Sequence, residues 1–294
     1  MLRSILFSLI LISSAHPGLG KPAFSIDSLK THTVLFRITH PDLQHDSYIF
    51  GTHHAFGKAF FDSLRHAAEA LASSSLLIKE NLNLPGHLAL DIINRRSPTT
   101  KWQKYLGHDD YGYILSLFSS SDLDFDKMTP AELFAFLSRF YKERICLGKD
   151  PSDPHLSLDD YIGQLAREKQ LEVAGLETTE EQLELINKDI EGMPRNVHRK
   201  RLAAMIARIQ AGTRDNCSEI DWYRNMDFDF KLAEPCTNAL VLSDRNQRWM
   251  VQIQEYLTTR TCFIAVGLSH LMFECGLLNQ LSGLGFVITP IRVK

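Results

Sequence analysis

Two stretches decide the fold: YIFGTHHAFG at residues 48–57 and CFIAVGLSHLMFECGLLNQL at residues 262–281. Each begins as an apolar run typical of a buried strand and passes into Gly-x-x-His, first with Gly51 and His54, then with Gly267 and His270. A helix pattern and a further strand pattern follow each motif. We therefore expect two weakly repeated β-GxxH-α-β halves.

The rest of the chain alternates in the same way. Strand patterns cover residues 33–39, 46–51, 76–80, 171–176, 262–266 and 286–291. Helix patterns cover residues 61–74, 131–144, 157–170, 178–186, 194–211, 239–257 and 273–281. This alternation predicts an α/β fold, with a mostly parallel or mixed central sheet flanked by helices and a helical insertion at about residues 85–150. We expect residues 21–294 to form a single α/β domain.

Residues 1–20 have the layout of a secretory signal peptide. Arg3 is followed by an apolar stretch at residues 5–12 and then by small residues, with cleavage expected between Ala15 and Gly20. The stretch is too short to span a bilayer, and no later segment of the sequence is long and apolar enough to do so. We therefore expect an exported protein, periplasmic or secreted, with no membrane span after signal removal.

The charge balance bears on possible partners. A formal net charge of −3 gives no reason to expect nucleic acid or an anionic membrane. Basic residues do gather at Arg195, Arg199, Lys200 and Arg201, but their spacing is that of a solvated helix face. The expected partner is a peptide or small-molecule substrate.

The five cysteines include no C-x-x-C, so the sequence gives no support for a zinc ribbon or a thioredoxin-type motif. In an oxidising compartment Cys217 and Cys236 could pair, because they bracket a polar segment. Cys262 begins an apolar run and is expected to be a core cysteine. The odd count leaves at least one thiol free unless the chain pairs with another.

The candidate site follows from the ends of the predicted strands. In open α/β sheets, ligands bind at the carboxyl ends of parallel strands. Glycine at such an end adopts backbone angles that other residues resist, or allows close approach of a ligand. If the two strands are neighbours, His54 and His270 converge. Glu80 ends a third strand, expected beside the first motif, and Glu177 ends a fourth.

His54, His270 and Glu80 form a donor set typical of a catalytic metal with an open position for water. Glu177 could bind the metal or act as a base. Asp159 and Asp160 are weaker candidates, because acidic residues also stabilise the first turn of a helix without any further role. The sequence contains no HExxH, Walker loop, Gly-x-Ser-x-Gly or GxGxxG motif. His53 is expected to point away from the site.

The segments taken together resemble the TraB/GumN family over about residues 34–292. The resemblance rests on YIFGTHHAFG, FDSLRHAAEALASSS, LLIKENL, SLDDYIGQLAREKQLEVAGLETTEEQL, SDRNQRWMVQIQEYL and the closing block from Cys262. This family is related to the Tiki Wnt-cleaving metalloproteases and to erythromycin esterase and ChaN-like haem-uptake proteins.

The resemblance implies roles for particular residues. His54 and His270 would be metal ligands or catalytic histidines, with Glu80 as their carboxylate partner. Glu177 occupies the Glu of the Gly-Leu-Glu segment. Arg245 occupies the Arg of the Arg-Asn segment, where a guanidinium could bind a carboxylate or stabilise an oxyanion. Judged alone, Arg245 would be a surface salt bridge on a long helix.

The chain departs from the family pattern at two positions. Lys79 precedes Glu80 where the family usually has an apolar residue, so its charge either alters the site or points away from it. Phe273 replaces a glycine shortly after His270, and we expect a tighter loop there.

Three functions remain open. The first is an exported metal-dependent hydrolase, foremost a peptidase, in which Mn, Co or Zn activates a water, Glu80 or Glu177 manages protons and Arg245 holds the developing charge. The second is a metal-independent, esterase-like hydrolase with His54 as general base. The third is a non-catalytic protein that binds a peptide or haem.

Overall fold

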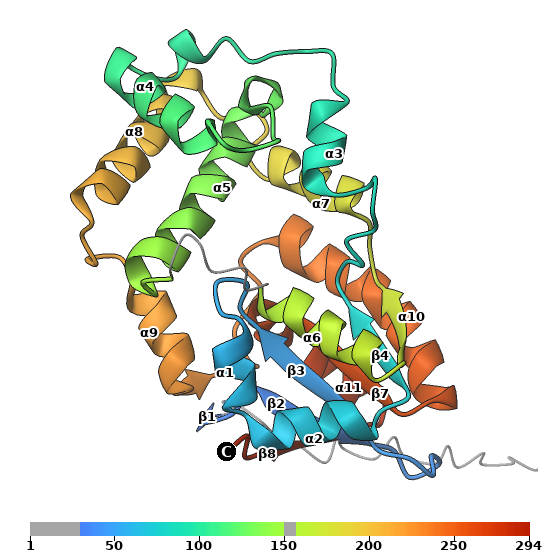
Figure 1. The fold of residues 1–294 in the computed structure, drawn as a ribbon. Coiled ribbons are helices and arrows are strands. Elements are labelled where there is room, and N and C mark those ends of the chain that lie inside the picture. The colour runs from blue at the N-terminus through green and yellow to red at the C-terminus, as the bar shows by residue number, and fades with distance from the viewer. Residues whose placement is uncertain (1–29, 150–156) are drawn as a thin grey trace, which may run out of the picture.

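A computed structural model describes residues 30–149 and 157–294, and a mixed sheet forms the centre of its lower lobe (Figure 1). The strand order is β5-β4-β7-β3-β2-β8. Their bounds are β2 Leu35–Thr39, β3 Ser47–Thr52, β4 Leu76–Lys79, β5 Glu172–Gly175, β7 Cys262–Gly267 and β8 Val287–Ile291. Four strands, β5, β4, β7 and β3, are parallel, and β2 is antiparallel to both of its neighbours. The predicted α/β fold with a mixed sheet is confirmed; the proposed signal peptide lies outside the described residues.

The strands that carry the two Gly-x-x-His motifs are neighbours at the centre of this sheet. Strand β7 is buried along almost its whole length, as expected for a strand covered on both faces. It runs parallel to β3, with Gly51 paired to Val266 and Thr52 to Gly267. Both motifs therefore leave the sheet at the same edge, side by side. The suggested internal repeat stays a prediction.

The position of Glu80 differs from the prediction. Strand β4 pairs with β7, so β7 lies between β4 and β3. Glu80 is therefore beside the second motif, and the expectation that it lies beside the first is wrong. The prediction assumed that β3 and β4, which follow each other in the chain, are also neighbours in the sheet, but the C-terminal strand β7 lies between them.

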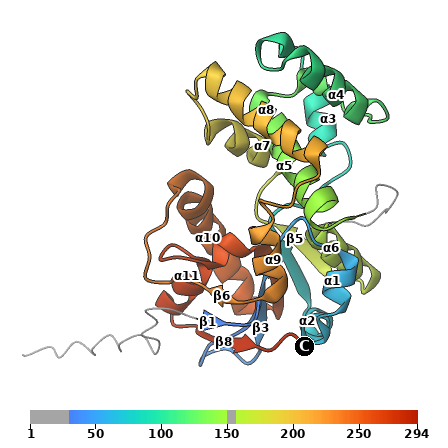
Figure 2. The ribbon, with the colours of Figure 1, turned by 90° about the vertical axis from the view of Figure 1, so that its left-hand side faces the viewer.

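Helices cover both faces of the sheet (Figure 2). On one face lie α1 (Lys58–Asp62), α2 (Arg65–Ser73) and α6 (Leu158–Glu168), and on the other lie α10 (Asp244–Thr259) and α11 (Leu277–Gly283). The helix expected at residues 61–74 is broken into α1 and α2, where the Ser63 hydroxyl donates to the carbonyl of Phe60 at 2.7 Å. Such side-chain bonds to the backbone compete with the helical pattern.

A second group of helices, which we call the helical lobe, stands above the carboxyl ends of β3 and β4 (Figure 1). It consists of α3 (Ala89–Asn94), α4 (His108–Phe118), α5 (Pro130–Tyr141), α7 (Thr179–Lys188) and α8 (Arg195–Ala211), with short turns η1 (Trp102–Lys104) and η2 (Phe125–Lys127). The predicted insertion at residues 85–150 supplies the first three of these helices. Helices α5 and α7 each begin with a capping box, Thr129 with Glu132 and Thr178 with Glu181.

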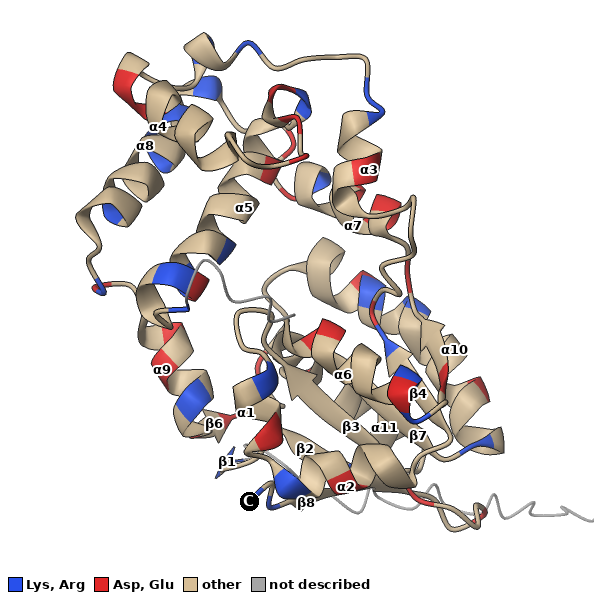
Figure 3. Cartoon of the chain, in the orientation of Figure 1, with Lys and Arg blue, Asp and Glu red and all other residues tan. Residues whose placement is uncertain are grey.

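Helix α8 carries the basic cluster on its solvent-exposed side. Arg199 and Lys200 are exposed, whereas Leu202, Met205 and Ile206 are buried against the helical lobe. Figure 3 shows the blue positions along α8, and acidic positions elsewhere in both lobes. The cluster is the solvated face of an amphipathic helix, as predicted.

Disulfides join distant parts of the chain. Cys146, at the end of the π-turn η3 (Lys142–Cys146), is bonded to Cys217, which precedes α9 (Ser218–Asn225). Cys236 is bonded to Cys275. The predicted pairing of Cys217 with Cys236 is therefore wrong, because the fold places each beside a cysteine that is distant in sequence. Cys262 is free and buried in β7, as expected.

The remaining elements are small. Strands β1 (Lys30–Thr31) and β6 (Phe228–Asp229) form a two-stranded antiparallel sheet, and the π-turn η4 (Ala239–Ser243) leads into α10. Within residues 30–149 and 157–294, no helix is both long and apolar enough to cross a bilayer.

Candidate functional site

Four strand ends bring the predicted site residues to one edge of the sheet. His54 follows β3, and His270 lies in the short turn η5 (Leu268–Leu271) that follows β7. Glu80 and Glu177 follow β4 and β5, and the amide of Glu177 donates to the carbonyl of Glu80 at 2.9 Å. The sequence prediction that strand ends gather these residues is therefore borne out by the topology.

Arg245, from the first turn of α10, connects three of them. Its Nε and Nη2 donate to the two oxygens of Glu177, at 3.0 and 2.5 Å, and Nη2 also donates to Glu80 at 3.0 Å. Its Nη1 lies 3.0 Å from Nε2 of His270 and donates weakly to the carbonyl of Val241. The side chain is only 9% exposed, so the alternative of a surface salt bridge is wrong.

A guanidinium has five N–H donors, and here they point at protein acceptors. In this arrangement Arg245 holds Glu80, Glu177 and His270 in place. Its suggested role in holding charge on a substrate stays a prediction, as do the acid and base roles of Glu80 and Glu177.

His270 is a neutral, buried imidazole. Its Nδ1 lies 2.7 Å from Oδ1 of Asn246, and the Trp249 ring packs against it with centroids 4.4 Å apart. Burial lowers the pKa of His270 to about 4; Glu80 opposes this shift and Arg245 adds to it. At neutral pH the ring therefore carries no charge.

His54 is held differently. Its Nδ1 lies 2.6 Å from Oδ2 of Asp159, and the other oxygen of Asp159 accepts a 2.6 Å hydrogen bond from the hydroxyl of Thr52. The charge of Asp159 raises the pKa of His54 to about 9, against the opposing effect of desolvation. The His54 side chain is 56% exposed, whereas the Asp159 side chain is only 13% exposed. The pair therefore consists of a solvent-accessible imidazole held by a largely buried carboxylate.

The charges on the two sides of the site act on each other. Burial alone would raise the pKa of Glu80, but the positive charges of His270 when protonated, His54 and Arg245 hold it below its usual range. Since His270 is neutral at pH 7, His54 and Arg245 supply this stabilisation. Glu80 also accepts a hydrogen bond from the amide of Gly267 at 2.6 Å.

The two motif glycines are explained by close packing rather than by unusual backbone angles. A Cβ on Gly51 would lie 2.6 Å from Cδ1 of Leu268, which belongs to the second motif. A Cβ on Gly267 would lie 3.1 Å from Oε1 of Glu80. Neither glycine has a positive φ. Close approach of another group was one of the two predicted reasons for glycine at these positions. The approaching groups are the side chains of Leu268 and Glu80 rather than a ligand.

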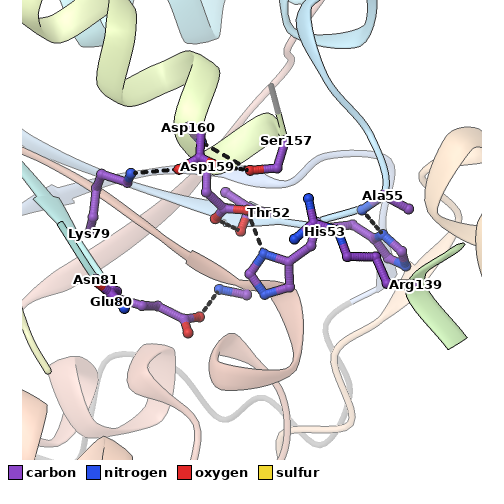
Figure 4. Close-up of polar contacts among 12 residues, drawn as sticks. Thr52, His53, Ala55, Lys79, Glu80, Asn81, Arg139, Ser157, Asp159 and Asp160 are labelled. Carbon is purple, nitrogen blue, oxygen red and sulfur yellow. Dashed lines mark hydrogen bonds and ion pairs between the residues drawn. The ribbon is translucent and has the colours of Figure 1, made fainter. Parts of the chain in front are cut away.

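Lys79 lies on the other face of the sheet from Glu80. Its Nζ is 3.6 Å from Oδ1 of Asp160, and Figure 4 shows Lys79 directed at Asp160 with Glu80 pointing away from both. Asp160 also accepts from the Ser157 hydroxyl, and Ser157 caps α6. As predicted, Asp160 belongs to the helix start.

Two further residues near the motifs are accounted for. His53 turns away from the site, as predicted, and its Nε2 lies 3.0 Å from Oε1 of Glu219 on α9. Phe273 has a φ of 68°, the left-handed conformation in which glycine is the usual residue. The chain therefore keeps the turn that a glycine would make, and its amide bonds to the carbonyl of Phe230 at 2.9 Å.

Asp159 is the candidate site residue that sequence reasoning underrated. Its signal was the pair Asp159–Asp160 at the start of a helix, where acidic residues are common without any further role. Only the fold shows that the first turn of α6 meets the end of β3, so that Asp159, and not Asp160, contacts His54.

The site fits a divalent metal in donor type and charge but does not display converging donors. Glu80 and Glu177 share the guanidinium of Arg245, and Asp159 pairs with His54, so these three carboxylates carry one negative charge more than Arg245 and a protonated His54 compensate. However, His270 and Glu80 are engaged by Arg245. Among the described residues, no three His, Cys, Asp or Glu side chains are grouped so as to hold a metal ion.

Comparisons with known proteins place the chain in a family. Searches of curated proteins and of solved structures found no match. A model of the TraB/PrgY/gumN family matches residues 34–290, a span that includes both Gly-x-x-His motifs, Glu80, Glu177 and Arg245. Because this match covers most of the sequence, the chain belongs to the TraB/PrgY/gumN family.

Proposed function

We propose that this protein is an exported hydrolase that cleaves a peptide or another substrate with an activated carbonyl. The observation that carries the proposal is the His54–Asp159 pair: a half-exposed imidazole backed at 2.6 Å by a largely buried carboxylate. A base oriented by a third group is the usual arrangement for activating a nucleophile. The pair stands at the carboxyl edge of parallel strands, where such sheets bind ligands.

The geometry supports a simple sequence of proton transfers. Asp159 holds the Nδ1 side of His54, so Nε2 is the nitrogen left for a water molecule. Because the pKa of His54 is raised to about 9, the unprotonated ring becomes available as the pH rises toward that value. That ring takes a proton from the water as the water oxygen attacks the carbonyl carbon, and then returns the proton to the leaving group. Thr52 helps by fixing the second oxygen of Asp159. Glu80, Glu177 and Arg245 form the buried, charged wall beside this reaction.

A metal-dependent peptidase is the second candidate, and the excess of buried negative charge favours it. His54, His270 and Glu80 would hold Mn, Co or Zn, and Arg245 would have to release His270 and Glu80. A bound metal would supply a Lewis acid and lower the pKa of a coordinated water.

Export is part of the proposal. Residues 1–20 have the pattern of a signal peptide, and the two disulfides suit an oxidising compartment such as the periplasm or the extracellular space.

The test uses the chain expressed with its own N-terminus and purified from the exported fraction. A panel of peptides and esters is assayed alone, with a chelator, and with added Mn²⁺, Co²⁺ or Zn²⁺, while bound metal is measured directly. Chelator-resistant hydrolysis that His54→Ala abolishes supports the first candidate. Stoichiometric metal that is lost in the His54→Ala/His270→Ala double variant, with chelator-sensitive turnover, supports the second. Tight binding of a peptide or haem with no turnover would reject both in favour of a binding protein.

A further inference from the structure

Asn246 is buried completely beside the site, one residue after Arg245 on α10. Its Nδ2 lies 2.9 Å from the carbonyl oxygen of Cys275 and 3.3 Å from that of His270. Its Oδ1 lies 2.7 Å from Nδ1 of His270. One amide thus contacts both the backbone and the ring of the same histidine.

These contacts decide which way the amide faces. Carbonyl oxygens only accept hydrogen bonds, so the amide atom that faces the carbonyls of Cys275 and His270 must be the NH₂ group. The atom that faces the ring is then the amide oxygen, which only accepts. Nδ1 of His270 must therefore carry the proton, and Nε2 must be the unprotonated nitrogen.

A second contact leads independently to the same tautomer. Nη1 of Arg245 can only donate, and it lies 3.0 Å from Nε2 of His270. This contact is a hydrogen bond only if Nε2 has a free lone pair. The contacts of Asn246 and Arg245 therefore require the same tautomer, and the two residues bind the two ring nitrogens on opposite edges of the ring.

The backbone that orients Asn246 is itself tied down. The carbonyl of Cys275 also accepts from Nε2 of Gln280 at 2.8 Å, and Cys275 is disulfide-bonded to Cys236. The preceding residue, Glu274, donates from its amide to the carbonyl of Glu234 at 2.9 Å. The acceptor that sets the amide's direction is thus part of a cross-linked turn.

We infer that Asn246 is a positioning residue that fixes His270 as the Nδ1–H tautomer and keeps its Nε2 lone pair facing Arg245 and Glu80. The Trp249 ring packs against His270 at an interplanar angle of 43° and makes no hydrogen bond to either ring nitrogen. The hydrogen bond between Nδ1 of His270 and Asn246 does distinguish the two ring edges. This inference concerns the ring itself and goes beyond the proposed hydrolysis; its test needs no substrate.

The test is nitrogen NMR of the full chain labelled with ¹⁵N-histidine, in which His270 is assigned by its loss in His270→Gln. The wild-type protein should show a protonated Nδ1 and an unprotonated Nε2 for this ring. Asn246→Leu removes the acceptor at nearly equal volume and should replace this single pattern with exchanging or averaged signals.

Gln280→Leu is the matched control, because it removes a side-chain hydrogen bond to the same Cys275 carbonyl and Gln280 does not contact His270. It should leave the His270 signals unchanged. A wild-type ring protonated at Nε2 would overturn the inference even if Asn246→Leu does not fold. An unchanged His270 pattern in folded Asn246→Leu would overturn it as well. Because neither readout depends on turnover, failure here is distinct from failure of the proposed hydrolase.

Discussion

Arg245 is the residue on which the acidic strand ends of β4 and β5 depend. Glu177 is 1% exposed at its side chain and Glu80 is 8% exposed, so neither can rely on water to stabilise its charge. Arg245 supplies the compensating charge to both. The same guanidinium stacks on the Trp249 ring, 4.5 Å from its centroid.

Replacing Arg245 should therefore be costly. Arg245→Met leaves two buried carboxylates without their partner and should lower the free energy of unfolding by about 3–5 kcal/mol, measured by urea denaturation near pH 7. The matched control is Arg260→Met, which breaks the solvent-screened pair with Glu172 and should cost far less. Equal effects of the two substitutions would contradict the assigned role.

Gly51 offers a test of the packing between the two motifs. In Gly51→Ala the new methyl group would press on the side chain and Cα of Leu268, and the unfolding free energy should fall by about 1–3 kcal/mol. Gly112→Ala is the control, since Gly112 is an exposed residue of α4 with nothing within 4 Å of its Cβ position. That substitution should raise stability, by up to about 1 kcal/mol. A neutral Gly51→Ala would show that the motifs are not packed as described.

The titration of His54 tests its pairing with Asp159. The pKa of His54 is raised to about 9, so the pair contributes stability that is fully present below about pH 6.5, the ordinary histidine pKa, and is lost as the pH rises through about 9. In the metal-free protein, NMR should find this ring titrating near 9, and near its ordinary value in Asp159→Asn. Glu180→Gln, which alters the pair with His87, should leave His54 unchanged. If His54 titrates normally in the wild type, Asp159 does not hold it.

At the level of secondary-structure elements, the sequence predicted which residues end strands but not the order of the strands. The apolar runs before Gly51 and Gly267 were sufficient to place β3 and β7, because buried parallel strands are continuous in hydrophobicity. That β7 enters between β3 and β4 depends on contacts between segments far apart in sequence, which no local pattern encodes. For this reason Glu80 was assigned to the wrong motif.

The same limit applies to α6 and to the disulfides. Ser157 and the two acidic residues after it predicted a helix start, and the cap is present. Which acid meets His54 depends on how α6 docks on the sheet. Likewise, the Cys146–Cys217 and Cys236–Cys275 bonds span 71 and 39 residues, and sequence proximity suggested a different pair.

At the level of the whole molecule, the two lobes meet through α9. The Cys146–Cys217 disulfide ties the start of α9 to the end of η3, which continues α5. Glu219 on α9 bonds both to His53, which follows β3, and to Lys142, whose Nζ lies 2.8 Å from Oε1 of Glu219. Figure 2 shows α9 between the helical lobe and the sheet. The site edge of the sheet is thereby held below the helical lobe.

The disulfides of the exported protein should be visible by thiol titration. Denatured without reductant, each chain should show one reactive thiol, Cys262, and five after reduction. The double variant Cys146→Ala/Cys217→Ala should lose about 4 kcal/mol of unfolding free energy, from the loop-closure estimate for this separation. Cys262→Ala is the control for thiol count. Five free thiols in the protein from the exported fraction would contradict both the pairing and the proposed compartment.

The most direct measurement of the central claim is hydrolysis of the peptide and ester panel by the exported protein and by His54→Ala. His40→Ala is the matched control, because His40 also lies near an aspartate, Asp42, but in the turn at the opposite end of the sheet. The account predicts that His54→Ala lowers kcat/KM by at least about 100-fold, the scale of general acid–base catalysis, and that His40→Ala leaves it unchanged. Turnover in His54→Ala equal to that of the wild-type protein would contradict it.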